Sequence, residues 1–405
     1  MRILHVTPYS DQTWAYGGIP RVVGALATTQ VRHGHHVTIC TTDVYDEFTR
    51  LHSPDGRRWN AWKPIERSDG VVVRVFPNVS NRAAYQVQLF LPLGMRRFLE
   101  RHAREFDVAH LHACRNVPGL LAARTLQRAG VPFVLAPNGT APIIERRHGA
   151  KRAFDVVFGN RVIASASRVL AVSEAEHRQL VSAGVPVGAI RAVPNPIDLT
   201  EFTPPLPRGR LRGRLGLGDA PIVLFLGKLT PRKHVNVLIE AVARTREPVR
   251  LVVAGNDMGA LGDAQSLVKR LGLGFRVVFT GLLAGRERLE ALADADVVAY
   301  VSEHEVFGLV PLEALLAGTP VVVGDDSGCG ELIRSVGGGL VVPVGQSDPL
   351  ASALEEVLMA IGDWRATAAE AGVRVRSWFG EETVCRRLER VYEEVTSGTA
   401  AEQVA

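Results

Sequence analysis

The sequence contains few cysteines, and they are scattered along the chain. Four occur among 405 residues, without a CxxC pair or a Cys/His spacing typical of metal ligands: Cys40, Cys114, Cys329 and Cys385. A disulfide framework and a structural zinc site are therefore not indicated. Because scattered free cysteines are typical of a reducing compartment, we expect a cytoplasmic protein.

Long hydrophobic runs are also lacking. No stretch of about 18 apolar residues is present, which is the length that a membrane-spanning helix needs. The chain starts directly with a strand-like pattern at residues 2–7, without a charged segment followed by a long apolar one. We therefore expect neither a secretory signal peptide nor a membrane-spanning segment.

The glycine-rich fingerprint of dinucleotide-binding proteins is absent. Gly17 and Gly18 follow the first predicted strand and precede a predicted helix over residues 21–33. A glycine pair at this place lets the backbone come close to an anion, so both glycines are candidate ligand-binding residues. The pair is not GxGxxG, and no acidic residue stands at the proper distance from it, which argues against an NAD-dependent dehydrogenase.

Two patterns suggest a metal ion only weakly. His33, His35 and His36 lie at a predicted helix-to-strand turn, but no acidic residue or cysteine is near them in the sequence. Asp294 and Asp296 match a short DxD pattern, but they stand between a predicted helix and a strand, where capping or surface exposure explains them better. We predict no metal site.

Charge is unevenly distributed, although 46% hydrophobic and 22% charged residues are ordinary for a soluble protein of two or three domains. Residues 1–195 contain 25 Lys and Arg against 14 Asp and Glu, whereas the remainder contains 22 against 28. A basic half suits a membrane surface, a nucleic acid or an anionic substrate, and an arginine-rich genomic composition explains part of it equally well. Sparse aromatic residues and the acidic second half argue against nucleic-acid binding.

Two stretches combine arginines with large apolar side chains, residues 89–106 and 145–158. The first is predicted to form a basic amphipathic helix. A surface helix with a solvated face explains such a pattern, and contact with anionic lipid headgroups is the alternative.

Short apolar runs alternate with helical patterns through the whole chain. Predicted strands cover residues 2–7, 37–42, 71–76, 107–112, 131–136 and 169–172 in the first half, and 222–226, 251–254, 277–280, 297–301, 321–323 and 340–342 in the second. This alternation predicts parallel sheets covered by helices, which is an α/β fold. A proline-dense connector over residues 193–207 indicates a domain boundary.

The segment from 300 to 320 combines the end of a strand, a polar loop and a helix. The loop follows the carboxyl end of the strand, where open α/β sheets bind ligands. Phe307-Gly308-Leu309 offers backbone N–H groups at the predicted helix start, which suit a phosphate. Glu305 and Glu313 would repel a phosphate and are better suited to accept hydrogen bonds from hydroxyls. A solvated loop glutamate and a glutamate favoured by the helix dipole are the alternative.

Polar side chains follow two other predicted strands. Lys228 and Lys233 lie in the loop after residues 222–226, where two cations suit a diphosphate; a solvated surface loop is the alternative. His112 ends the strand at 107–112, at the sheet edge where ligands bind. For a lone histidine, a structural role is the alternative.

Residues 302–314, Ser-Glu-His-Glu-Val-Phe-Gly-Leu-Val-Pro-Leu-Glu-Ala, closely resemble the signature of the family 4 retaining glycosyltransferases with the GT-B fold. The Lys233 loop and the connector around Asn195 resemble the same family. The resemblance implies a GT-B, α/β architecture of two facing Rossmann-like domains with an interdomain cleft. We accordingly expect an acceptor-binding domain at 1–195, a linker at 196–220, a nucleotide-sugar-binding domain at 221–378, a helix at 379–396 that crosses back to the first domain, and a disordered tail at 397–405.

The resemblance also assigns roles to residues. Glu305 and His112 would position the donor sugar, Glu313 would hold the ribose, and Lys233 would stabilise the leaving diphosphate. The full donor-binding set is Gly17, Gly18, Lys228, Lys233, Phe307, Gly308, Leu309 and Glu313, and the catalytic set is Glu305, His112 and Lys233. Candidate acceptor-binding residues are Asn138, Gly139, Arg146 and Arg147. Two departures from the family pattern are Lys228, where the family has an arginine fork, and Cys329, in a glycine-rich turn.

The resemblance implies a retaining glycosyltransferase that moves a sugar from a nucleotide-diphosphate sugar to an acceptor hydroxyl, and we expect it to act in cell-surface polysaccharide or glycolipid synthesis. We expect no cofactor and no metal requirement, since the nucleotide-sugar is a co-substrate. The expected partners are this donor and a sugar or lipid-linked acceptor, with peripheral contact at the inner face of the cell membrane and no nucleic acid. A GT-B nucleotide-sugar epimerase or a non-catalytic nucleotide-sugar-binding protein is the alternative.

Overall fold

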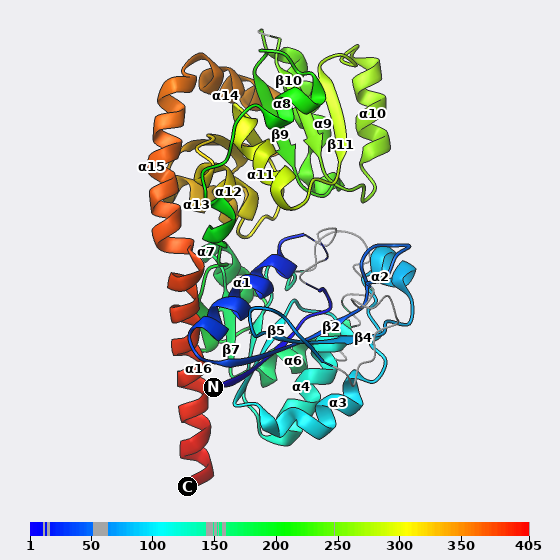
Figure 1. Ribbon diagram of the computed structural model, residues 1–405, viewed down its shortest axis with the longest axis vertical. Coiled ribbons are helices and arrows are strands. Elements are labelled where there is room, and N and C mark those ends of the chain that lie inside the picture. Colours follow the sequence, from blue (N-terminus) through cyan, green and yellow to red (C-terminus); the bar gives the residue numbers. More distant parts are fainter. Residues whose placement is uncertain are drawn as a thin grey trace. The chain divides into compact units, whose positions relative to one another are not determined.

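The structure is a computed structural model that describes residues 1–10, 13, 17–51, 64–142, 149, 152, 154–155, 159–246 and 248–404. The chain divides into two compact units. Unit 1 comprises Met1–Pro196 and Glu381–Ala405, and unit 2 comprises Ile197–Gly380. Each unit is an α/β layer structure with its own sheet (Figure 1).

Within the described residues, unit 1 contains one eight-stranded sheet. Its strands, in spatial order, are β3 (Ile65–Glu66), β4 (Val72–Phe76), β2 (His36–Thr42), β1 (Arg2–Val6), β5 (Val108–His112), β6 (Phe133–Ala136), β7 (Arg168–Ala171) and β8 (Ile190–Ala192). All neighbours are parallel except β3 and β4, which are antiparallel. The strand order changes direction at β1, which lies between β2 and β5. Ligands of open α/β sheets bind at such a switch point.

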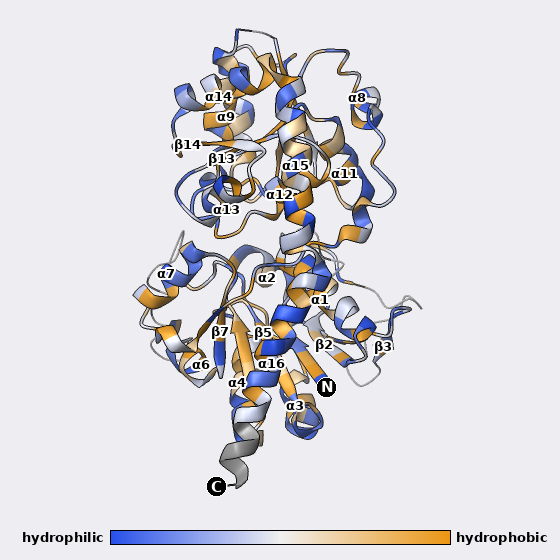
Figure 2. Ribbon diagram, turned by 90° about the vertical axis from the view of Figure 1, so that its left-hand side faces the viewer, coloured by the Kyte–Doolittle hydropathy of each residue, from blue (hydrophilic) through white to orange (hydrophobic). Residues whose placement is uncertain are grey.

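The α-helices in the described part of unit 1 are α1 (Ile19–Arg32), α2 (Asn81–Val87), α3 (Met95–His102), α4 (Val117–Ala129), α6 (Asn160–Ser165), α7 (Glu174–Ser182) and α16 (Glu381–Val404). The last helix of the chain, α16, packs beside α1 and also contacts β5 (Figure 1). The central strands of unit 1 are hydrophobic, whereas much of α16 is hydrophilic (Figure 2). Helix α16 therefore buries one face against the unit and exposes the other.

Unit 2 contains a six-stranded parallel sheet in its described part. The spatial order is β11 (Val277–Gly281), β10 (Arg250–Ala254), β9 (Ile222–Leu226), β12 (Val297–Tyr300), β13 (Val321–Gly324) and β14 (Gly339–Val342). Its helices are α8 (Arg210–Leu215), α9 (Val235–Arg244), α10 (Leu261–Arg270), α11 (Gly285–Asp294), α12 (Leu309–Leu316), α13 (Gly328–Val336), α14 (Ser347–Met359) and α15 (Ile361–Phe379).

The middle strands of unit 2 are apolar along their whole length. All residues of β9, β12 and β13 are buried, because helices cover both faces of a parallel sheet. The strand order reverses between β9 and β12. The loops that follow these two strands therefore meet at the edge where a ligand is expected.

The predicted fold class is confirmed, since both units are parallel α/β structures. The helix predicted over 89–106 is wrong in its first part, because α3 begins only at Met95. Gly94 precedes α3 with a φ of 84°, a backbone conformation that ends any continuous helix from residue 89.

The boundaries in the structure differ in detail from those expected. Residues 197–220 group with unit 2 and include α8, whereas we expected a linker there. Helix α16 continues to Val404, across the tail that we expected to be disordered. Because α16 carries six acidic and three basic residues, unit 1 has a net charge of +8, less than the +11 of residues 1–195.

Candidate functional site

The loops after β9 and β12 bring Lys233 and Glu305 together at the switch point of unit 2. Lys233 ends a short 3-10 helix, Pro231–Lys233, and its side chain is 5% exposed. Its Nζ donates to the Glu305 carboxylate and to the Tyr300 hydroxyl, and lies 4.3 Å from the centre of the Tyr300 ring. The Tyr300 hydroxyl in turn donates to Glu305 at 3.0 Å. Two of the three predicted catalytic residues are thus in direct contact.

Charge holds Glu305 in its ionised form. Burial raises the pKa of Glu305, but the positive charges of Lys233 and Arg232 outweigh burial and lower this pKa to about 2. Burial lowers the pKa of Lys233, against the opposing effect of Glu305. A buried cation and a partly exposed carboxylate therefore lie side by side, which suits a ligand with both anionic and hydroxyl groups.

The segment between Glu305 and α12 presents backbone N–H groups. The described residues supply no hydrogen-bond acceptor to the amides of Phe307, Gly308 and Leu309. Gly308 has a φ of 79°, and a Cβ there would lie 2.6 Å from the Cys329 Sγ, so glycine is required. The Cys329 amide donates to the Glu305 carbonyl at 2.9 Å. Cys329, a departure from the family pattern, thus packs against the loop and fixes its backbone.

Glu313 lies on the buried side of α12 and is 2% exposed. It forms an ion pair with Arg288 of α11, which is 3% exposed and also binds Glu201 at 2.6 Å. This buried arginine was not identified from the sequence, because nothing in the helical pattern of residues 285–294 distinguishes it. The predicted contact of Glu313 with a ribose stays a prediction.

Lys228 lies in the same loop as Lys233 and is partly buried. The preceding Gly227 is close to the next strand: a Cβ on Gly255 would lie 1.8 Å from the Gly227 carbonyl oxygen. The loop after β10 therefore needs glycine at position 255 to pack at this edge of the sheet. The binding role of Lys228 remains untested.

In unit 1, three histidines lie together at the switch point beside β1. His5 of β1 pairs in register with His110 of β5, and His112 lies two residues further on the same face. His5 Nδ1 is 2.9 Å from His112 Nε2, and His5 Nε2 is 2.7 Å from the Gln30 Oε1 of α1. Burial lowers the pKa of all three rings, that of His5 to about 4, so they are neutral at pH 7.

These contacts assign the ring protons. An amide oxygen only accepts hydrogen bonds, so His5 Nε2 carries a proton and donates to Gln30 Oε1. His5 Nδ1 is then unprotonated and accepts a hydrogen bond from His112 Nε2–H. His112 Nδ1 is then unprotonated, and no described residue forms a hydrogen bond with it. His112 therefore retains a buried acceptor nitrogen, which suits a donor hydroxyl.

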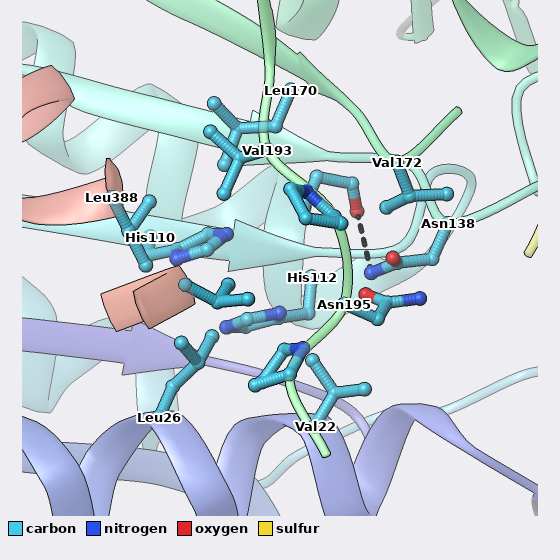
Figure 3. Close-up of a pocket in the computed structure, with 14 residues that line it drawn as sticks. Val22, Leu26, His110, His112, Asn138, Leu170, Val172, Val193, Asn195 and Leu388 are labelled. Atoms are coloured by element: carbon cyan, nitrogen blue, oxygen red, sulfur yellow. Dashed lines mark hydrogen bonds between the residues drawn. The ribbon is translucent and has the colours of Figure 1, made fainter. Parts of the chain in front are cut away.

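His110 and His112 line a pocket of unit 1 together with Asn138 and Asn195 (Figure 3). The pocket wall is otherwise mainly apolar and includes Val22 of α1 and Leu388 of α16. The predicted residues His112 and Asn138 thus share one pocket. Gly139 follows Asn138, and its amide donates to the buried Glu176 at 2.6 Å.

Other predicted residues fall at separate places. Gly17 has a φ of 94° and Gly18 precedes α1, whose Val22 amide donates to the Gly18 carbonyl at 3.1 Å. Arg146 and Arg147 lie outside the described residues. Asp294 is a capping group, as expected: it accepts from the Gly209 amide at the start of α8.

The sequence analysis missed several residues of these networks: His5, Gln30, Glu176, Arg232, Arg288 and Tyr300. Of these, Tyr300 had a usable signal, since it is the last residue of β12. The others act through partners that are distant in sequence, such as Glu176, whose carboxylate accepts a hydrogen bond from the amide of Gly139.

Comparison with known proteins identifies the family. The model for "Glycosyltransferase Family 4" matches residues 16–201, and that for "Glycosyl transferases group 1" matches residues 208–363. The chain is 31% identical to a D-inositol 3-phosphate glycosyltransferase of Xylanimonas cellulosilytica, over 98% of this chain and 96% of the relative. It is 32% identical to a GDP-mannose-dependent alpha-mannosyltransferase of Mycobacterium tuberculosis, over 90% and 89%.

Solved structures share the fold. HepE of Anabaena in complex with UDP and glucose has a TM-score of 0.75 at 21% identity, covering 97% of this chain and 100% of that one. Sucrose-phosphate synthase of Thermosynechococcus elongatus has a TM-score of 0.74 at 21% identity, covering 98% and 99%. The sequence matches along both units, together with this shared fold, lead to one conclusion: the chain belongs to the family 4, group 1 glycosyltransferases of the GT-B fold.

Proposed function

We propose that this glycosyltransferase moves a sugar from a nucleotide-diphosphate sugar to an acceptor hydroxyl with retention of the anomeric configuration. The observation that carries the proposal is the contact of Lys233 with Glu305, beside the amides of Phe307-Gly308-Leu309. Cations and backbone amides stabilise the charge that develops on a leaving diphosphate. An ionised carboxylate next to them accepts hydrogen bonds from sugar hydroxyls.

The donor diphosphate binds Lys233, Lys228 and the amides of residues 307–309. Lys233 then donates to a phosphate oxygen in place of part of its hydrogen bonding to Glu305. The carboxylate of Glu305 can then accept hydrogen bonds from hydroxyls of the sugar. Because the loop already carries two lysines and Arg232, the chain's own cations balance the diphosphate without a metal ion. The ribose binds Glu313, whose orientation is fixed by Arg288.

Retention requires that the acceptor attacks from the face that the diphosphate leaves. We assign no carboxylate as a covalent nucleophile, since Glu305 is engaged by a cation and a tyrosine hydroxyl. The departing phosphate oxygen takes the proton of the acceptor hydroxyl, so the O–H bond breaks as the new glycosidic bond forms. His112, as an acceptor nitrogen, orients a hydroxyl of the donor sugar.

The acceptor binds unit 1 at Asn138 and Gly139. Unit 1 has a net positive charge, which suits an acceptor from a cell-surface polysaccharide or glycolipid pathway. Leu89, Leu91 and Leu93 are 42%, 36% and 56% exposed, and they directly precede the arginine-rich helix α3. Apolar side chains beside arginines suit the surface of an anionic membrane. None of the described helices is long and apolar enough to span a membrane.

Relatives differ in the nucleotide that their names give: GDP-mannose for the mycobacterial mannosyltransferase and UDP for HepE. We would therefore measure the thermal stabilisation of the full chain by UDP, GDP, ADP and their common sugar conjugates. A ligand at 100 times its dissociation constant adds about 2.7 kcal/mol to the free energy of unfolding. Stabilisation by one base only, weakened in Lys233→Met and unchanged in the control Lys269→Met, is the expected result.

Assays of nucleotide release and glycoside formation, with and without acceptor, distinguish the alternative functions. A nucleotide-sugar epimerase would release free nucleotide at the same rate with and without acceptor. A non-catalytic binding protein would be stabilised but would form no glycoside. Absence of stabilisation by every nucleotide would contradict the proposal.

A further inference from the structure

The turn between α1 and β2 carries His33 and His35, which lack an acidic or cysteine partner nearby in the sequence. The fold supplies both partners from the other end of the chain. Helix α16 packs beside α1 (Figure 1). Its residues Cys385 and Glu389 lie against this turn. The residues all belong to unit 1.

One carboxylate oxygen is the centre of the cluster. Glu389 Oε1 lies 2.8 Å from His33 Nδ1, 3.2 Å from His35 Nε2 and 3.3 Å from Cys385 Sγ. The donor atoms of His33, Cys385 and Glu389 all lie within 4.8 Å of one another. Zinc bonds of about 2.0 to 2.3 Å hold tetrahedral donor atoms about 3.3 to 3.8 Å apart, so a small outward movement accommodates the ion.

The surroundings support the donors as they do in zinc proteins. His33 Nε2, on the far side of the ring, donates to Glu382 at 2.7 Å. A carboxylate behind a histidine fixes the ring and increases the basicity of the coordinating nitrogen. Cys385 is buried, whereas His33 and Glu389 remain 18% and 14% exposed, so an ion can enter from solvent.

We propose that His33 Nδ1, Cys385 Sγ and Glu389 bind one Zn²⁺ ion that fastens α16 to the α1–β2 turn, with His35 beside the fourth position. Thiolate, imidazole and carboxylate are donors that zinc prefers. Binding displaces the thiol proton of Cys385 and the proton between His33 and Glu389 to solvent. The ion acts on the stability of unit 1 and takes no part in sugar transfer. The proposal replaces our expectation of no metal site, because that expectation rested on sequence distance.

The test uses the full chain, freed of metal by a chelator and then titrated with Zn²⁺ or Co²⁺ alone. We expect the chain to retain one zinc ion after dialysis. We also expect zinc to raise the midpoint temperature of thermal unfolding by about 5 °C or more. The Co²⁺ form should show a thiolate-to-cobalt charge-transfer band. Both signals should be lost in Cys385→Ala and in His33→Ala, the latter at a partly exposed position that tolerates truncation.

Two matched controls separate the site from general metal affinity. Cys114→Ala removes another cysteine, and His102→Ala removes a histidine of α3 that pairs with Glu105 at 2.6 Å and stacks on Phe98. Both should bind zinc like the wild type. Failure of the wild type to retain zinc, a cobalt spectrum without a thiolate band, or unchanged binding in Cys385→Ala would overturn the proposal.

Discussion

His5 Nδ1 lies 2.9 Å from His112 Nε2, so the tautomer of His112 is set by a residue on the neighbouring strand. Gln30 sets the tautomer of His5 in the same way, at 2.7 Å. We therefore predict that Gln30→Leu lowers kcat about tenfold with little change in the KM of the donor, because His112 loses its fixed acceptor nitrogen. Steady-state kinetics with varied donor measures both constants.

The control for this prediction is the same change in a chain that lacks His112. In His112→Phe, the additional Gln30→Leu change should have no further effect on kcat, since the two residues act as one unit. An equal loss in both backgrounds would show that Gln30 acts independently of His112.

The buried histidines predict a loss of stability in acid. Burial lowers the pKa of His5 from 6.5 to about 4, so the folded chain resists protonation that the unfolded chain accepts. The contribution of neutral His5 to the free energy of unfolding is fully present above pH 6.5. This contribution, roughly 3 kcal/mol, is lost as the pH falls through about 4. Urea unfolding of the wild type and His5→Gln across pH 4 to 7 measures the difference. If the free energy of unfolding changed with pH in the same way in both proteins, the assignment of a neutral His5 would be contradicted.

Removing the Lys233 cation should weaken transition-state stabilisation. We predict that Lys233→Met lowers kcat/KM for the donor by about 100-fold or more, because one charge-assisted contact to the diphosphate is lost. Lys269→Met, at an exposed position of α10, should keep wild-type kinetics. A loss of less than about threefold in Lys233→Met would rule out the diphosphate contact.

The buried pair of Glu313 and Arg288 allows stability and binding to be separated. Glu313→Leu alone leaves a buried guanidinium without this partner and should destabilise the fold by about 3 to 5 kcal/mol. The double variant Glu313→Leu with Arg288→Met should recover most of this loss, because two apolar side chains replace the pair. Urea unfolding measures both variants.

The same double variant tests the ribose contact. If Glu313 binds the ribose, the recovered protein should still bind the nucleotide about tenfold or more weakly than the wild type. Wild-type affinity in the stable double variant would leave Glu313 with a structural role only.

Strand positions could be read from the sequence because parallel strands are continuous apolar runs. The predicted run at 222–226 coincides with β9, and that at 297–301 ends one residue beyond β12. The short β8, three residues at Ile190–Ala192, was missed because its pattern is too brief to stand out from a loop.

The placement of side chains could be predicted only as far as the strand ends. Loops after β9 and β12 were expected at one sheet edge, but the contact of Lys233 with Glu305 depends on the strand order, which places residues 72 apart in sequence together. The packing of α16 beside α1 was likewise invisible in the local pattern, and it supplies Cys385 and Glu389 to the His33 turn. Local sequence determines elements, whereas these networks arise from tertiary packing.

The stereochemistry of the product tests the central proposal most directly. With the donor identified by stabilisation, the wild type is incubated with an α-linked nucleotide-sugar and an acceptor, and the anomeric coupling of the new glycoside is measured by NMR. We predict an α-linked product, formed only with acceptor present and lost in Glu305→Gln, which should still bind the nucleotide. A β-linked product would contradict retention, and nucleotide release without glycoside formation would contradict the transfer itself.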